Sequence, residues 1–299
     1  MSRRGWALFV ALSVIWGIPY LMIKVAVKEI DPVVVAFGRT FLGAVLLLPI
    51  ALRGRSFGPV LARWKWLLLY TVVEIVGPWW LLGHAETRLT SSTAGLLLAV
   101  VPLIAAVILL RTGRDRFDGR RMVGLGMGLA GVITLVGLDI HLDDLASVGA
   151  VMVTAIGYAT GPIIINRKLS DVPPMGVITG SLILATLIFS PFAVWLRPQS
   201  VSAPAGWSVI GLAVLCTALA FVAFFALIAE AGPARATVIT YINPAVAILL
   251  GVLVLGEHFT VGIAIGFPLV ILGSVLATAR TRTKASPTTE DPLAEPVAC

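Results

Sequence analysis

Long apolar stretches alternate along the chain with short breaks that are rich in charge, glycine or proline. A membrane-crossing helix needs about 20 mostly apolar residues to span about 30 Å of hydrocarbon. Ten stretches meet that requirement, approximately over residues 6–27, 32–52, 64–83, 89–110, 119–137, 146–165, 174–195, 206–229, 234–255 and 260–279. The pattern therefore predicts an all-α membrane protein with ten transmembrane helices.

The chain also repeats itself at a constant offset of 142 residues. The matching pairs include Pro32 and Pro174, Gly38 and Gly180, Pro49 and Pro191, Pro102 and Pro244, and Gly131 and Gly273. A duplicated unit with an odd number of helices enters the membrane in opposite senses, and inverted repeats are a common frame for alternating access in transporters. We predict a first five-helix repeat over residues 1–139 and a second, inverted five-helix repeat over residues 146–279.

Composition excludes an ordinary soluble enzyme. Hydrophobic residues make up 59% of the chain, charged residues 12%, and the mean hydropathy is +1.01, whereas a soluble domain is roughly 45–50% apolar. Residues 280–299 are polar and rich in proline and threonine, too poor in apolar residues to offset the entropy of ordering. We expect them to form a disordered cytoplasmic tail.

The net charge of +7 could suggest a nucleic-acid partner, but the positions of the charges give another explanation. We therefore expect no nucleic-acid partner. If the N-terminus is inside, 17 Lys and Arg residues fall on the inner side and four on the outer side. Cytoplasmic loops of membrane proteins carry such an excess. We therefore expect a multi-pass protein in the lipid bilayer with both termini in the cytoplasm.

Prolines inside several predicted spans free backbone carbonyls and bend or break the helix. Pro102 and Pro244 hold equivalent positions in the two repeats and free the carbonyls of Leu98 and Thr240. The prolines that we expect to act as kinks or hinges are Pro19, Pro78, Pro102, Pro162 and Pro244. Bent helices near the midplane are where transporters tend to bind substrate. The alternative is that these kinks only shape the packing.

Two charged residues lie deep within the predicted spans, Glu74 in the third and Arg39 in the second. A charge at that depth costs about 2.5 to 3.5 kcal/mol on insertion scales. One hypothesis is that Glu74 and Arg39 face a polar cavity and meet the ammonium and carboxylate of a zwitterion. The alternative is that they pair with each other or with the backbone and stabilise the bundle.

Aromatic and polar residues near these depths complete the set of substrate-binding candidates. They are Trp16, Tyr20, Tyr70, Trp79, His84, Tyr158, Tyr241 and Asn243. Trp16 and Tyr20 are one helical turn apart and would form an aromatic wall. Interfacial anchoring explains Trp79 equally well, and His84 fits a structural or gate residue better than a proton carrier.

The sequence offers no catalytic triad, metal-ligand cluster or phosphate-binding glycine loop. We therefore expect no enzymatic activity, no metal and no cofactor. Because no ATPase motif is present either, transport energy would come from gradients or from the substrate itself.

Several motifs resemble a known family. They are Trp16-Gly17, the run Ser91-Ser92-Thr93-Ala94-Gly95 leading to Pro102, Asn243-Pro244, and Leu255-Gly256-Glu257. Together they look like the EamA family of the drug/metabolite transporter superfamily, whose members have ten helices in two inverted five-helix repeats. The chain is most similar to the YddG-type amino-acid exporters, in which an acidic residue is found where this chain has Glu74.

The resemblance implies an inner-membrane secondary transporter that exports amino acids or related small metabolites by alternating access through a central cavity. The first alternative is a sugar, nucleotide-sugar or other metabolite or drug carrier of the same superfamily. Anionic cargo of that kind would require more cavity cations than Arg39 and Lys24 supply. The second is a non-transport membrane protein. The expected partners are a small molecule and the lipid bilayer, and a monomer would suffice.

Overall fold

The computed structural model describes residues 1–54, 56–111, 119–232 and 236–278, and within these ranges every regular element is a helix. The first repeat contains α1 (Arg3–Ile15), α2 (Pro19–Ala26), α3 (Pro32–Arg53), α4 (Phe57–Ala62), α5 (Trp64–Tyr70), the π-helix η1 (Thr71–Val76), α6 (Gly77–Glu86), α7 (Ser91–Leu98), α8 (Val101–Arg111) and α9 (Gly119–Asp139). The second contains η2 (Leu142–Asp144), α10 (Leu145–Lys168), α11 (Pro174–Trp195), α12 (Ala203–Ala213), the π-helix η3 (Val214–Leu219), α13 (Ala220–Ala231), η4 (Thr237–Tyr241), α15 (Asn243–Leu255) and α16 (Val261–Thr278).

Ten stretches of these helices are long and apolar enough to cross a membrane, so the prediction of ten transmembrane helices is confirmed. The predicted boundaries need small corrections. The third span runs to Glu86 instead of ending near residue 83, and the eighth begins at Ala203 instead of residue 206. Residues 279–299, which include the predicted tail, lie outside the described part of the chain.

Local sequence explains where the helices begin and end. Asp31 caps α3 by accepting from the backbone N–H of Val33 at 2.8 Å, and Pro32 occupies the first turn, where no amide is needed. The C-terminal end of α15 is set by Gly256, which takes a left-handed conformation with φ +67°. Residues with a Cβ adopt that backbone conformation only at a free-energy cost.

Four of the five predicted hinge prolines coincide with changes in helix type or direction. A break precedes Pro19, and another separates α7 from α8 just before Pro102. Pro244 follows the change from η4 to α15, and Pro78 follows the π-helix η1. Pro162 differs, because α10 runs unbroken through it. One missing amide does not end a helix when the neighbouring turns keep their own bonds.

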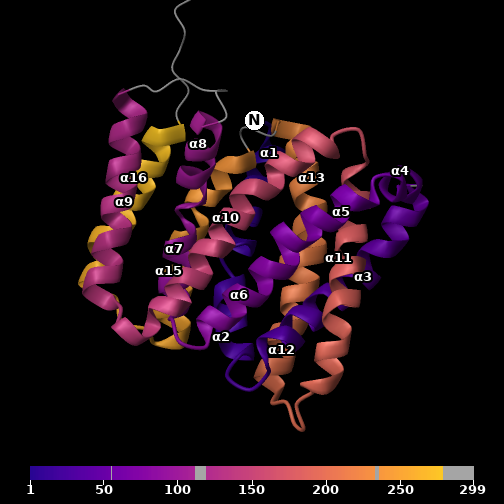
Figure 1. Cartoon of the computed structure of the whole chain (residues 1–299), viewed down its shortest axis with the longest axis horizontal. Coiled ribbons are helices and arrows are strands. Elements are labelled where there is room, and N and C mark those ends of the chain that lie inside the picture. Colours follow the sequence, from indigo (N-terminus) through magenta and orange to yellow (C-terminus); the bar gives the residue numbers. More distant parts are fainter. Residues whose placement is uncertain (55, 112–118, 233–235, 279–299) are drawn as a thin grey trace, which may run out of the picture.

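The bundle has two ends and two flanks (Figure 1). We call the end that carries the N-terminus the N-terminal face and the opposite end, where α12 begins, the distal face. Helices α9 and α16 lie side by side at one flank, while α3 packs against α11 toward the other. The helices α2, α6, α7, α10 and α15 lie between these flanks (Figure 1).

Polar contacts at the two faces repeat with the halves exchanged. At the distal face Glu29 accepts hydrogen bonds from Ser202 N and Oγ at 2.9 and 2.8 Å. At the N-terminal face the residue 142 positions after Glu29, Asp171, forms an ion pair with Arg63 at 2.6 Å. Each carboxylate follows the first span of its repeat and binds the other repeat. We call these contacts the distal clasp and the N-terminal clasp.

A second pair of contacts follows the same rule. Arg88 and Asp144 form an ion pair at the distal face, with 3.5 Å between Arg88 Nη1 and Asp144 Oδ1. At the equivalent positions Glu230 and Ser2 form a hydrogen bond at the N-terminal face. Two independent sets of contacts thus relate the repeats as the inverted arrangement requires.

Candidate functional site

The guanidinium of Arg39 lies at the centre of a polar cluster that both repeats build. Arg39 is on α3 and is 8% exposed. Its Cζ lies 3.6 Å from the centroid of the Trp79 ring on α6, a cation–π distance. Its Nε donates to Thr217 Oγ1 on η3 at 2.9 Å. The charge is therefore held by an aromatic face and a hydroxyl.

The two terminal nitrogens of Arg39 have no hydrogen-bond partner among the described residues, yet they are not sealed from solvent-accessible space. The ion pairs found in the described part of the chain are Arg63–Asp171 and Arg88–Asp144, so Arg39 and Glu74 do not pair with each other. A guanidinium fork in this state matches the geometry of a carboxylate.

Two π-helices position the groups around Arg39. The first is η1, which carries Glu74. At its end the amide of Gly77 donates to Val72 O, five residues earlier. In η3 the Thr217 hydroxyl donates to Leu212 O, also five residues earlier, and so presents its oxygen to Arg39. The two π-helices hold positions in their repeats that agree to within one residue. Such turns often occur at functional sites.

Tyr158 on α10 connects the parts of the cluster. Its side chain lies close to that of Trp79 and within electrostatic range of Arg39 and Glu74. The hydroxyl is therefore near both the cation and the carboxylate.

Glu74 packs against the backbone of α10. A Cβ at Gly161 would collide with Glu74 Oε2, so the absence of a side chain there makes room for the carboxylate. Oε2 is buried without a hydrogen-bond partner, whereas Oε1 has no partner but is not sealed. Tyr70, one turn before Glu74, lies within electrostatic range of it and of Tyr158. Glu74 thus offers one oxygen to the space between the helices.

The repeat places an apolar counterpart opposite this cluster. Trp16 and Tyr158 hold equivalent positions, as do Trp79 and Phe221. The Tyr158–Trp79 contact accordingly recurs as a contact between Trp16 and Phe221, with ring centroids 6.0 Å apart, and Trp16 also packs on Phe224 at 4.8 Å. The first contact lies beside a cation, whereas the second consists of uncharged aromatic rings.

Three of the predicted site residues lie away from the cluster. His84 is exposed and has its ring 6.4 Å from that of Trp80. The hydroxyl of Tyr241 is 2.5 Å from Thr278 Oγ1 on α16. The Asn243 side-chain amide, in the orientation that satisfies its polar atoms, donates to Ile239 O at 2.9 Å and Ser13 O at 3.1 Å. Asn243 therefore joins η4 to the end of α1.

Comparison with known proteins decides the family. The model of the EamA-like transporter family matches residues 3–137 and again residues 145–279. The chain belongs to the EamA-like transporter family. The second match begins 142 residues after the first (residue 145 against residue 3), which is the offset of the repeat.

Known proteins are similar to this chain along most of their length. The uncharacterized inner membrane transporter YedA of Escherichia coli (strain K12) is 28% identical over 258 residues, which cover 84% of this chain and 82% of the relative. The uncharacterized transporter YoaV of Bacillus subtilis (strain 168) is 23% identical over 284 residues, or 90% and 94% of the two chains. A solved crystal structure has the same fold, with a TM-score of 0.67 at 18% identity over 92% of this chain and 96% of that one. The protein is thus a multi-pass membrane transporter.

Sequence reasoning missed several polar residues of this EamA-like transporter near the distal face. Glu257 accepts from Ser91 N at 2.7 Å and Ser92 N at 2.9 Å, and so caps α7 from the other repeat. Lys24 donates to Glu86 O at 2.6 Å and Leu89 O at 2.7 Å. Glu86 was missed as well, because the predicted third span ended near residue 83. The span in fact continues to Glu86, so Glu86 belongs to the helix and not to the following loop.

Proposed function

We propose that this transporter exports amino acids or related small zwitterionic metabolites across the cell inner membrane by alternating access. The observation that carries the proposal is the Arg39 guanidinium, whose terminal nitrogens lack protein partners although the residue is 8% exposed. Such a group favours a ligand that brings its own carboxylate, because a charge held within a bundle needs compensation.

The groups around Arg39 favour the other parts of the same substrate. Glu74 Oε1 is unpartnered and would accept from an ammonium group. Trp16, Phe221 and Phe224 supply an apolar surface for a hydrocarbon side chain. Sugars and nucleotide sugars lack this combination of charges, and a phosphate ester would call for more than one cation. Both repeats contribute to the cluster, so a monomer suffices for the cycle.

The direction of transport follows from the topology that we propose. The excess of Lys and Arg puts the N-terminal face in the cytoplasm and the distal face in the periplasm. The interruptions next to Pro19, Pro102 and Pro244 give both repeats places to bend. Rocking of one repeat against the other would then expose the Arg39 cluster to each side in turn.

The test is counterflow in liposomes with the purified protein. Labelled leucine and phenylalanine are offered beside glucose and UDP-glucose, and leucinamide, which lacks the carboxylate, serves as competitor. We expect amino-acid counterflow, with leucine competing at least about tenfold better than leucinamide, since a hydrogen bond to a charged group is worth about 1.5–3 kcal/mol.

The variant Arg39→Gln connects that result to the site. It should lower leucine counterflow and remove the preference for leucine over leucinamide. Arg53→Gln is the matched control, because Arg53 is exposed at the end of the same helix. Counterflow of sugars alone, or an Arg39→Gln variant that behaves like the wild type, would overturn the proposal.

A further inference from the structure

Glu86 is a fully buried carboxyl group without a partner. It is the last residue of α6, is 0% exposed, and neither of its carboxylate oxygens has a hydrogen-bond partner. Neither of the ion pairs found among the described residues involves it. Burying an ionised carboxylate without a partner is costly, so such a position favours the neutral, proton-bound form.

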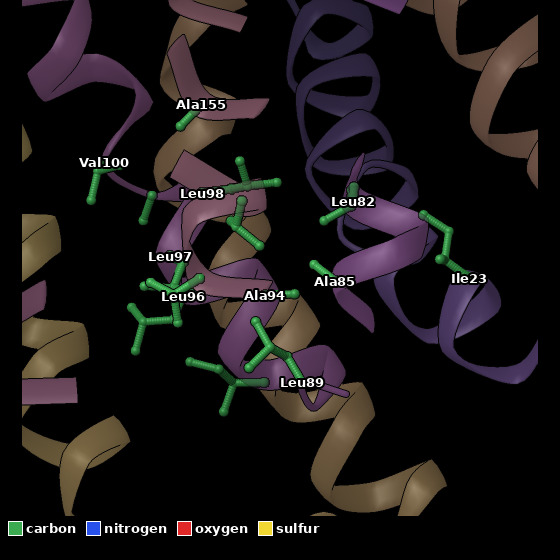
Figure 2. Close-up of a cluster of buried hydrophobic side chains, with 14 of the residues drawn as sticks. Ile23, Leu82, Ala85, Leu89, Ala94, Leu96, Leu97, Leu98, Val100 and Ala155 are labelled. Carbon is green, nitrogen blue, oxygen red and sulfur yellow. The ribbon is translucent and has the colours of Figure 1, made fainter. Parts of the chain in front are cut away.

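Apolar side chains are packed next to Glu86 in the sequence and in space. Its neighbour Ala85 belongs to a buried cluster with Ile23, Leu82, Leu89 and Ala94, which joins α2, α6 and α7 near the distal face (Figure 2). Ala85 and Leu89 are 0% and 5% exposed. We call this cluster the distal seal. Glu86 is as fully buried as this cluster in this conformation.

Charged groups approach Glu86 from both repeats without neutralising it. The Lys24 ammonium is bound to the backbone carbonyls of Glu86 and Leu89 rather than to the carboxylate. Glu257, from the second repeat, adds a negative charge within electrostatic range of Glu86. Lys28 lies beyond Lys24 and is exposed. The cation nearest to the carboxyl is thus already used elsewhere.

Two tyrosines extend from Glu86 toward the Arg39 cluster. Tyr20 on α2 lies within electrostatic range of both Glu86 and Tyr158. Tyr158 in turn lies within range of Glu74 and close to Trp79. Tyr20 also lies beside α7, since a Cβ at Gly95 would be 3.6 Å from its ring. Glu86 therefore occupies the junction between the distal seal and the candidate substrate site.

We propose that Glu86 is a proton-binding site that couples transport to a proton gradient. When the distal seal opens, the carboxylate takes up one proton from the periplasmic side and becomes neutral. In the sealed conformation it keeps that proton, and it releases it toward the cytoplasmic side when substrate binds. The Lys24 ammonium, already 2.6 Å from Glu86 O, is placed to move onto the carboxylate once the proton has left.

This inference rests on the proposed transport function, and one experiment separates the two. Leucine counterflow without a pH gradient tests transport, while accumulation driven by an imposed gradient tests coupling. For one-for-one exchange a difference of one pH unit supports about a tenfold concentration ratio, because one unit corresponds to about 1.4 kcal/mol. We expect about that ratio for the wild type.

The decisive variant is Glu86→Gln. It should keep leucine counterflow and lose the accumulation that the gradient drives. Asp143→Asn removes an exposed carboxylate at the same face and should keep both activities. Absence of counterflow in the wild type would contradict the transport function. Counterflow without any response to the gradient, or a Glu86→Gln variant that responds like the wild type, would overturn the role of Glu86 alone.

A second measurement does not depend on transport. Infrared spectroscopy of the purified protein at neutral pH should show the carbonyl band of a protonated carboxylic acid, which shifts in D₂O. Glu86→Gln should lose a component of this band that both Glu74→Gln and Asp143→Asn keep. If Glu86→Gln does not yield folded protein, Glu86→Asp should shift the band. A band that neither Glu86 variant alters would overturn the proposal.

Discussion

Single residues show two ways in which this bundle holds a charge. The buried Arg39 is stacked on Trp79 and bound to Thr217, with no carboxylate partner among the described residues. The exposed Glu29 at the distal face has its acceptors occupied instead. It accepts two hydrogen bonds from Ser202, which lower the pKa of the Glu29 carboxyl below its ordinary value. Arg39 thus keeps hydrogen-bond donors free for a ligand, whereas the Glu29 oxygens are occupied by Ser202 in the distal clasp.

The distal clasp predicts how stability depends on pH. A carboxyl whose pKa is lower in the folded state stabilises the fold above its unfolded pKa, about 4.3 for Glu, and loses that contribution as the pH falls through the folded value. Glu29→Gln should therefore lower the thermal midpoint near pH 7. The difference from the wild type should shrink below about pH 4.

Thermal unfolding of the detergent-solubilised protein between pH 3 and 7 measures this effect. Asp143→Asn is the control, since Asp143 is exposed on the same face and makes no such contacts. A Glu29→Gln difference that stays constant over the whole pH range would exclude the clasp as its cause.

At the scale of elements, glycines decide how closely helices approach. Helices α9 and α16 have the most extensive contact in the described part of the molecule. A Cβ at Gly131 would lie 2.8 Å from Val270 Cγ2 and 2.9 Å from Gly266 O. Gly126, on the same helix, has nothing within 4 Å of that position. The two glycines therefore have different tasks, close packing for one and surface exposure for the other.

Alanine substitutions separate these tasks. Both Gly131→Ala and Gly126→Ala gain helix propensity, but only the former forces α9 and α16 apart, at a cost of about 1–3 kcal/mol for overpacking. Gly131→Ala should lower the thermal midpoint relative to Gly126→Ala. Equal midpoints for the two variants would show that the contact tolerates a methyl group.

The whole molecule is an inverted duplication whose two faces differ in charge. The clasps and the Ser2–Glu230 and Arg88–Asp144 contacts exchange repeats between the faces. The Arg39 cluster does not follow this symmetry, because Arg39 and Glu74 lie on one side and aromatic rings hold the equivalent positions on the other. An asymmetric site inside a pseudo-symmetric frame suits a substrate with a polar head and an apolar side chain.

The orientation in the membrane is open to a direct test. Ser200 lies in the connection between α11 and α12 at the distal face, and Ser170 lies in the connection between α10 and α11 at the N-terminal face, both exposed. In a Cys299→Ser background, Ser200→Cys should react with a membrane-impermeant maleimide in intact cells. Ser170→Cys should react only after permeabilisation. The reverse pattern would invert the topology.

Much of the architecture could be predicted because its causes are local. Hydropathy over about 20 residues fixes a span, and a proline weakens the helix that contains it. Neighbouring residues alone are enough to predict three features. These are the ten spans, the helix interruptions at Pro102 and Pro244, and the position of Glu74 within a span. Pro162 shows the limit, since α10 remains continuous there despite the same local signal.

The sequence by itself thus determined the number of helices, the duplication and the family. The tertiary structure alone decided what the buried charges contact. Arg39 meets Thr217, 178 positions away, and Glu257 reaches Ser92 across 165 positions. The burial of Glu86 also depends on helices from elsewhere in the chain. Local pattern fixes which segments are helical, but the partner and the burial of a side chain depend on the packing of segments that are distant in sequence.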